Sequence, residues 1–289
     1  MVTLGKHKKT ERGLLMSKKS VTRKSDQNEI PQPYVKATQT TQDQQKTKNG
    51  LKIKLDDLKT FKPLTENQQK FFDSYKNGDY FIALHGVSGT GKSFCAVYKA
   101  LEEVLDKSNP FQKLIVVRSN VPSREVGHLP GDIEQKMEIY QQPYIQICET
   151  LFGRKDAWER LCEQGHVEFI STSFIRGMSF DNAIILVDEI QNTTWPEIFT
   201  VTTRCGYQSK IIFCGDYRQN DLLKKKNDVS GLIKFFDVAR RMKSFTRIEF
   251  TVDDIVRSSL VRDFIIATME HDDDLDRKEA NEKHNPNTV

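Results

Sequence analysis

The sequence lacks the marks of a secreted, disulfide-stabilised or membrane-spanning protein. Its five cysteines are scattered and include no C-x-x-C pair, which argues against a disulfide framework or a zinc site and indicates a reducing compartment. The longest apolar run, at 183–187, has the length of a strand, far short of the ~18 residues of a membrane span. The basic N-terminus has no apolar segment followed by small residues, so no secretory signal is expected. We therefore expect a cytoplasmic protein with no membrane partner.

Metal-ligand spacing is also missing among the histidines, and His85, His128 and His166 are interpreted as structural or incidental.

Apolar residues are scarce in residues 1–55, which hold 13 Lys and Arg against 4 Asp and Glu, a net charge of +9 in a chain of net charge +4. This segment cannot bury enough apolar surface to offset chain entropy. We expect a disordered basic tail, which is either merely solvated or a tether for nucleic acid through counterion release.

Residues 56–270 show a different pattern, in which short apolar runs alternate with helical periodicity. Strands are expected at 80–86, 113–117, 166–170, 183–189, 210–216 and 246–250. Helices are expected from Thr65, after the phosphate loop, over 132–164, and over 252–269 with Thr251 and Asp254 as a capping box. This alternation predicts an α/β fold, a parallel sheet with helices on both faces. Residues 271–289 are expected to form a polar C-terminal tail.

The stretch GVSGTGKS at 86–93 follows an expected strand and opens an expected helix, which is the context that a phosphate-binding loop requires. Glycines let the backbone approach phosphate oxygens, with N–H groups pointing inward at a helix N-terminus. Lys92 is predicted to reach the β- and γ-phosphates, and Ser93 to offer its hydroxyl to Mg²⁺. The predicted nucleotide-binding residues of the loop are Gly86, Val87, Ser88, Gly89, Thr90, Gly91, Lys92 and Ser93.

A second motif, AIILVDEIQN, places Asp188 at the carboxyl end of an apolar strand. There the Asp188 carboxylate can position Mg²⁺ beside Lys92 and Ser93. Glu189 follows directly, at a position suited to a general base that activates the attacking water. The alternative is that Glu189 only caps the next helix. The pair favours an ATPase that activates water over GTPases of the Ras type and most nucleoside kinases.

A third motif, KIIFCGDYRQND, delivers Gly215, Asp216 and Gln219 to the end of another strand. Ligands of open α/β sheets bind in the crevice at the carboxyl ends of the strands. Gln219 is therefore predicted to sense the γ-phosphate, although a simple turn after the strand is the alternative.

These motifs, together with LTENQ, GHLPGD, TTRCG and DDIVRSSLV, resemble the PhoH-like ATPases over roughly residues 62–268. That family is similar to the motor core of superfamily 1 helicases, and the resemblance implies a P-loop NTPase with a RecA-like sheet. Isolated motor cores of this kind are common among bacteriophage members, for which the location would be the host cytoplasm. The sequence departs from the family pattern at 118–120, at His128 and at Ile190.

The resemblance also implies roles that the residues alone do not establish. Asn67 and Gln68 would contact the adenine of ATP, and Gln191 would couple hydrolysis to movement. Arg257 would be an arginine finger supplied across the subunit interface of a homo-oligomer, typically a hexameric ring. The implied function is a Mg²⁺-dependent ATPase that acts on RNA or single-stranded nucleic acid in the manner of a helicase. Two alternatives stay open: an ATP-dependent phosphotransferase, and an ATP-gated assembly or binding module with little turnover.

Overall fold

A computed structural model describes residues 52–119, 133–216 and 231–284. Its centre is a six-stranded sheet of order β3-β2-β4-β5-β1-β6, in which every strand pair is parallel. The strands are β1 (Phe81–Gly86), β2 (Lys113–Arg118), β3 (Val167–Ser171), β4 (Ala183–Asp188), β5 (Lys210–Gly215) and β6 (Thr246–Phe250). All six lie where the apolar runs predicted them, so the α/β fold class is confirmed.

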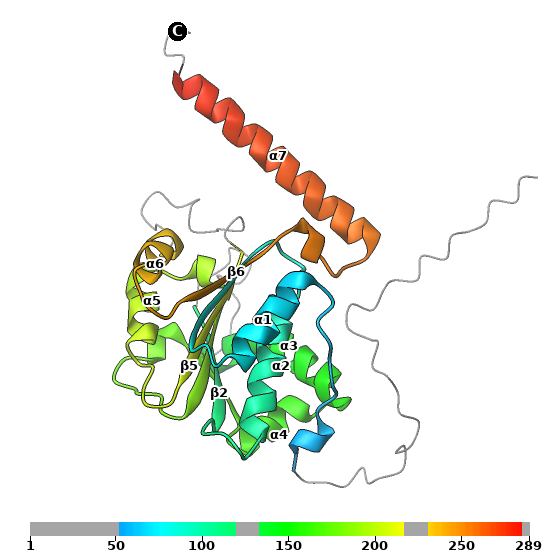
Figure 1. Ribbon diagram of the computed structural model, residues 1–289, viewed down its shortest axis with the longest axis vertical. Helices are drawn as coiled ribbons and strands as arrows, with labels where there is room; N and C mark the ends of the chain where they lie inside the picture. The colour runs from blue at the N-terminus through cyan, green and yellow to red at the C-terminus, as the bar shows by residue number, and fades with distance from the viewer. Residues whose placement is uncertain (1–51, 120–132, 217–230, 285–289) are drawn as a thin grey trace, which may run out of the picture. The chain divides into compact units, whose positions relative to one another are not determined.

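Two layers of helices cover the sheet (Figure 1). One face carries α1 (Glu66–Lys76), α2 (Lys92–Leu105), α3 (Ile133–Phe152) and α4 (Ala157–Glu163), and the other carries α5 (Trp195–Thr202) and α6 (Leu232–Ala239). Successive strand residues point to opposite faces, so Ile82 and Leu84 pack under the first layer and Ala83 under the second. Burial on both faces explains why the inner strands β2, β4, β5 and β1 are nearly continuous apolar runs, whereas the edge strand β6 alternates exposed and buried residues.

The expected helix over 132–164 is two helices in the structure. α3 ends at Phe152, and Gly153 follows with φ +68°, a left-handed conformation that glycine adopts without strain. α4 then begins at Ala157 after Asp156, whose carboxylate accepts hydrogen bonds from Arg154 and Arg160. Helical periodicity alone did not reveal this break.

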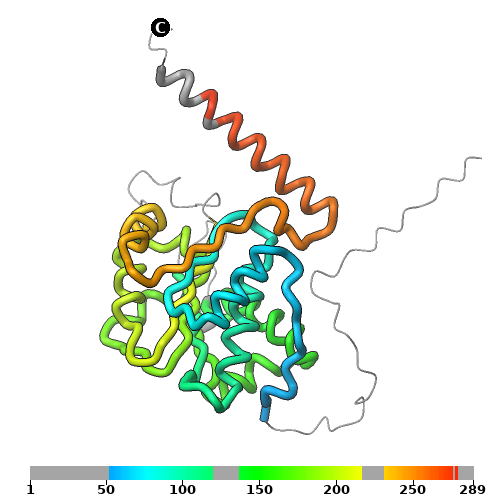
Figure 2. Tube along the Cα trace, viewed as in Figure 1, coloured from blue at the N-terminus to red at the C-terminus, as the bar shows by residue number. Residues whose placement is uncertain are grey.

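The last expected helix also differs from the prediction. Thr251 and Asp254 do form a capping box, but on the short 3-10 turn η5 (Val252–Asp254). The chain then extends, because the backbone N–H of Val256 donates to the carbonyl of Gly89 in the phosphate loop, at 3.1 Å. Helix α7 (Ser259–His284) begins only after this contact and continues through residues expected to form a polar tail. Figure 2 follows the trace from β6 through this turn into α7.

Strand register aligns the polar strand ends at one edge of the sheet. Gly86 of β1 pairs with Phe250 of β6, and Arg118 of β2 pairs with Asp188 of β4. β5 ends beside them at Gly215. Because carboxyl ends of parallel strands meet at the same edge, the three sequence motifs converge there.

Candidate nucleotide-binding site

The phosphate loop connects β1 to α2, and its glycines take up backbone conformations that other residues rarely adopt. Gly86, Gly89 and Gly91 have φ values of +119°, +73° and +80°. A Cβ on Gly86 would lie 2.1 Å from the carbonyl oxygen of Phe250. That close approach lets the N–H of Val87 donate to the same oxygen, at 2.9 Å. β6 therefore holds the first turn of the loop in place.

Lys92 begins α2 and turns its ammonium group into the loop. Its Nζ donates to the carbonyls of Gly86 and Val87, at 3.0 and 2.6 Å, and to Oγ1 of Thr90, at 3.3 Å. Burial lowers the pKa of Lys92, and the carboxylates of Asp216 and Asp188 oppose that change. The cation is thus enclosed by the loop, and its contact with phosphate oxygens stays a prediction.

Ser93 and Asp188 are in direct contact. The Ser93 hydroxyl donates to Oδ1 of Asp188 at 2.9 Å, although 95 positions separate the two residues. The other carboxylate oxygen, Oδ2, accepts a 2.7 Å hydrogen bond from the hydroxyl of Tyr144 on α3. Asp188 is buried, and burial raises the pKa of Tyr144 well above its ordinary value. Tyr144 therefore stays protonated and acts as a donor.

Glu189 adopts an unusual backbone conformation for a residue with a side chain. Its φ and ψ of 55° and 45° lie in the left-handed region, where non-glycine residues are strained and cluster at functional sites. Oε2 of the carboxylate accepts from the Gln191 amide, and Oε1 lies 3.9 Å from the Arg118 guanidinium. Burial, and then the charge of Asp188, raises the pKa of Glu189. The Glu189 carboxylate thus lies between Gln191 and Arg118, and its side chain makes no hydrogen bond that caps the short helix η3 (Ile190–Asn192).

Gln191 links two strand ends. Its Nε2 donates to Glu189, and its Oε1 accepts from the backbone N–H of Asp216 at 3.0 Å. Gly215 makes room for this bridge, since a Cβ there would lie 2.5 Å from Oε1 of Gln191. The predicted sensor Gln219 and residue His128 lie outside the described residues.

Asn67 and Gln68 lie at the start of α1, against the loop and the turn η5. Gln68 is buried, accepts from the N–H of Leu64 at 2.8 Å and donates to the carbonyl of Thr90 at 3.0 Å. Asn67 is half-buried and donates to Asp254 at 2.7 Å. Gln68 thus joins α1 to the phosphate loop, and contact of either amide with adenine stays a prediction.

Arg257 lies beside the phosphate loop of its own chain. Its Cγ is 3.0 Å from the position that a Cβ on Gly89 would occupy, and Ile265 of α7 is the next neighbour at 3.4 Å. The side chain is exposed. A role across a subunit interface stays a prediction, which this placement neither requires nor prevents.

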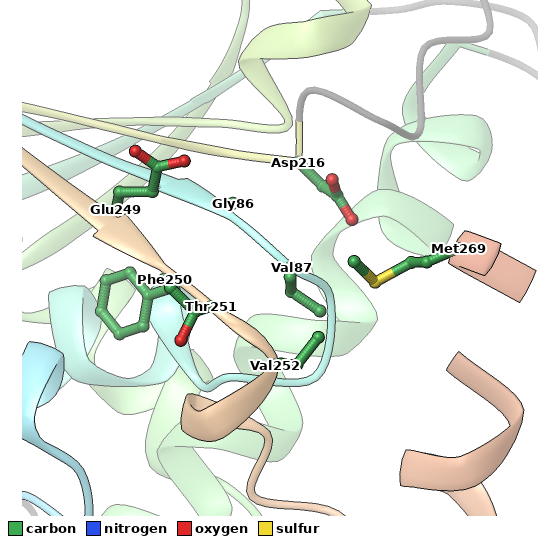
Figure 3. Close-up of a pocket in the computed structure, with 8 residues that line it drawn as sticks. All are labelled: Gly86, Val87, Asp216, Glu249, Phe250, Thr251, Val252 and Met269. Atoms are coloured by element: carbon green, nitrogen blue, oxygen red, sulfur yellow. The ribbon is translucent and has the colours of Figure 1, made fainter. Parts of the chain in front are cut away.

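A cavity of about 280 Å³ opens next to the first residues of the loop (Figure 3). Gly86, Val87 and Asp216 form one wall, residues 249–252 form another, and Met269 of α7 closes the space. α7 therefore borders the site directly.

The donor set fits Mg²⁺ bound together with a nucleotide. Hydroxyl and carboxylate oxygens are the ligands that this ion prefers, and it commonly takes only one or two from protein beside phosphate oxygens. Ser93 and Asp188 provide such a pair next to Lys92. Over the described ranges, no group of three or more His, Cys, Asp or Glu residues forms a metal cage of its own.

Two residues of the site lie outside the predicted set, Tyr144 and Arg118. Tyr144 lies within a helix and carries no motif, so no sequence signal could have found it. Arg118 ends β2 opposite Asp188, so its position at the carboxyl end of a predicted parallel strand was a signal that could have found it.

In the described ranges of the chain, none of the helices combines the length and the apolar character of a membrane span.

The parallel sheet, the glycine-rich loop and the buried Asp at the end of β4 define a P-loop NTPase fold. The PhoH-like protein family model matches residues 60–269, and the chain belongs to this family. The PhoH-like protein of Bacillus subtilis (strain 168) is 33% identical over 210 residues, 72% of this chain and 64% of that one. Protein PhoH of Escherichia coli (strain K12) is 31% identical over 179 residues, 61% of this chain and 49% of that one.

The PhoH-like protein of Mycobacterium leprae (strain TN) is 30% identical over 218 residues, 74% of this chain and 60% of that one. The chain thus spans less than two thirds of the length of these curated relatives. Among solved structures, the Pif1 helicase from Candida albicans aligns with 65% of this chain and 40% of its own, at 14% identity and a TM-score of 0.31.

Proposed function

We propose that this chain is a Mg²⁺-dependent ATPase. The observation that carries the proposal is the contact between Ser93 and Asp188 beside the enclosed Lys92, with Glu189 next in the chain. In this arrangement the proposed phosphate-binding cation (Lys92), the proposed metal-binding pair (Ser93 and Asp188) and the candidate base Glu189 lie at one edge of the sheet. Residues 56–270 form the ATPase domain in this proposal, between a basic tail and a polar C-terminal segment.

Each side chain has a distinct part in the reaction. Lys92 and the loop N–H groups bind the phosphates, and Ser93 and Asp188 hold Mg²⁺, which neutralises phosphate charge when bound. Glu189 orients the attacking water and accepts its proton. The raised pKa of Glu189 strengthens it as a base, because a carboxylate of higher pKa binds a proton more readily.

We further propose that a homo-oligomer of this chain couples ATP hydrolysis to the binding or remodelling of RNA or single-stranded nucleic acid. Support comes from the family resemblance of the sequence motifs and from the bridge that Gln191 makes between Glu189 and Asp216. Through that bridge, a change at the catalytic carboxylate reaches the end of β5. In an oligomer, Arg257 completes the site of a neighbouring subunit.

ATP turnover by the purified full chain, with and without single-stranded RNA or DNA, tests the proposal. We expect Mg²⁺-dependent phosphate release with no acceptor added, and faster release with nucleic acid. Phosphate transfer that requires an added acceptor would establish the phosphotransferase alternative. Tight ATP binding without turnover would establish the binding-module alternative, and the mass in solution with nucleotide reports assembly.

A further inference from the structure

Tyr144 of helix α3 contacts the carboxylate of Asp188 directly. Tyr144 is fully buried, and its hydroxyl donates to Oδ2 of Asp188 at 2.7 Å. The opposite oxygen, Oδ1, accepts from the Ser93 hydroxyl at 2.9 Å and from the N–H of Glu189 at 3.1 Å. The two oxygens of Asp188 therefore have different partners: Oδ1 bonds to Ser93 next to the phosphate loop, and Oδ2 bonds to Tyr144 of α3.

The tyrosine ring is fixed by its surroundings. It stacks on Trp158 with 6.0 Å between ring centroids, and Phe169 of β3 packs against it at 5.8 Å. Trp158 is itself oriented by a 3.0 Å hydrogen bond from its Nε1 to the Gln141 side chain. A side chain locked by packing in this way holds the hydroxyl at one position, which is what a supporting hydrogen bond to a metal ligand requires.

The chemistry of the contact suits support of a metal ligand. A tyrosine hydroxyl is neutral, so it fixes the orientation of the Asp188 carboxylate without cancelling the negative charge that attracts a cation. A lysine or arginine in the same place would compete with the metal for that charge. Hydrogen bonds from residues behind a metal ligand commonly set the affinity of the site.

We propose that Tyr144 is a positioning residue that holds Asp188 in the orientation needed to bind Mg²⁺ with nucleotide. This inference rests on the proposed function, since it concerns the same site. It assigns to α3 a role that the loop and strand motifs do not contain.

The test compares the whole chain of 289 residues with its Tyr144→Phe variant, which keeps the ring and removes only the hydroxyl. Mn²⁺ binding to the protein in the presence of ADP, followed by electron paramagnetic resonance, measures the metal site without turnover. We expect Mn²⁺ affinity to fall by about 10-fold or more, the range found when partners of metal ligands are removed. ADP affinity measured in EDTA should stay within about twofold, because the phosphate loop is untouched.

Tyr75→Phe is the matched control. Tyr75 is also buried in the same core cluster, and its hydroxyl has no hydrogen-bond partner within the described part of the chain. Removal of this hydroxyl should leave Mn²⁺ affinity unchanged. Equal effects of the two variants, or Mn²⁺ affinity within twofold of wild type in Tyr144→Phe, would overturn the proposal.

Thermal unfolding of both variants, recorded without nucleotide or metal, shows whether each is folded. If Tyr144→Phe unfolds at a lower temperature than the wild-type chain, Mn²⁺ binding is measured at a temperature where the variant is fully folded, and the same criterion applies.

Failure of this proposal can be distinguished from failure of the proposed ATPase function. A wild-type chain that binds Mn²⁺ with ADP but releases no phosphate contradicts the ATPase, whereas normal turnover with an unchanged metal affinity in Tyr144→Phe contradicts the role of Tyr144 alone.

Discussion

The Ser93 hydroxyl and Oδ1 of Asp188 form a 2.9 Å hydrogen bond between the start of α2 and the end of β4. The bond brings the two proposed metal-binding groups together. Ser93→Ala should therefore abolish the gain in ADP affinity that Mg²⁺ provides, a loss of roughly 10-fold or more. ADP affinity in EDTA should be unchanged.

Fluorescence titration with a labelled ADP, with Mg²⁺ and with EDTA, measures both quantities. Ser93→Thr keeps the hydroxyl and should restore the Mg²⁺ effect. Ser74→Ala is the control for loss of a serine hydroxyl elsewhere, since Ser74 donates only to the Phe71 carbonyl within α1 among the contacts described. Retention of the full Mg²⁺ effect in Ser93→Ala would contradict the assignment.

Glu189→Gln should separate ATP binding from hydrolysis. The amide is isosteric with the carboxylate but cannot accept a proton from water, so the rate of phosphate release should fall by about 10²-fold to 10⁴-fold while ATP affinity is kept. Phosphate release and equilibrium binding of labelled ATP are the measurements. Glu163→Gln, on the exposed side of α4, makes the same chemical change away from the site and should hydrolyse ATP normally. Wild-type turnover in Glu189→Gln would show that another group is the base.

Arg257→Ala should lose hydrolysis while it keeps ATP binding and assembly. If the arginine acts on a neighbouring subunit, mixing this variant with Lys92→Ala subunits should restore turnover, because the intact loop of one then meets the intact arginine of the other. Arg262→Ala removes a nearby α7 arginine that pairs with Asp253, and serves as the control. Mixed oligomers without activity would instead indicate that Arg257 acts on its own loop, beside which the structure places it.

Gln68 offers a test of what the amide at the start of α1 recognises. Gln68→Leu leaves the Leu64 N–H without its acceptor, so the free energy of unfolding should fall by about 1–3 kcal/mol. If the contact to Thr90 is the function of this amide, ATP and GTP affinities should weaken together, because that contact supports the phosphate loop and not the base. Asn67→Ala should weaken ATP more than GTP. An effect of Gln68→Leu on ATP alone would mean that Gln68 reads the adenine directly.

His85 should make the stability of the fold depend on pH. The imidazole is buried on β1, and its Nε2 accepts a hydrogen bond from Arg247, which requires the neutral ring. Burial, and then the charge of Arg247, lowers the pKa of His85 to about 4. Between pH 6.5 and 4 the unfolded chain binds a proton that the folded chain does not, so stability falls as pH falls.

Protonation linked to His85 should lower the free energy of unfolding by about 2 kcal/mol between pH 6.5 and 5. Above pH 6.5 the contribution of the neutral imidazole to stability is fully present. Urea unfolding at pH 5 and pH 7 measures it. In His85→Gln the side-chain oxygen can still accept a hydrogen bond from Arg247. The part of the fall in unfolding free energy that is due to His85 should be absent in this variant. His271→Gln, at an exposed position on α7, should keep the wild-type dependence. An unchanged pH dependence in His85→Gln would refute the linkage.

The sequence predicted the sheet because buried parallel strands are continuous apolar runs, and it predicted most of the site because strand ends meet at one edge. Gly86, Asp188 and Asp216 were grouped correctly on that argument. Tyr144 could not be found, since its contact with Asp188 joins a helix to a strand 44 positions away and depends on packing against Trp158. Roles of individual side chains stay predictions.

Helix boundaries show a second kind of limit. Thr251 and Asp254 carry a correct capping signal, but local periodicity could not reveal that Val256 would bond to Gly89 and delay the helix to Ser259. Tertiary contacts override local preference at such positions. The hydrogen bonds of the Gln68 amide with the Leu64 N–H and the Thr90 carbonyl are also tertiary or turn contacts, which the sequence pattern does not reveal.

The place of β6 has a consequence for biosynthesis. β1, which leads into the phosphate loop, lies between β5 and β6, and the Phe250 carbonyl at the end of β6 holds the N–H of Val87. A ribosome therefore makes the nucleotide loop long before the strand that fixes it. Until β6 emerges, β1 is an open edge of the sheet, which is a template for pairing with other chains. The loop gains its hydrogen bond to β6 only once synthesis has passed Phe250, so the order of synthesis delays completion of the nucleotide site.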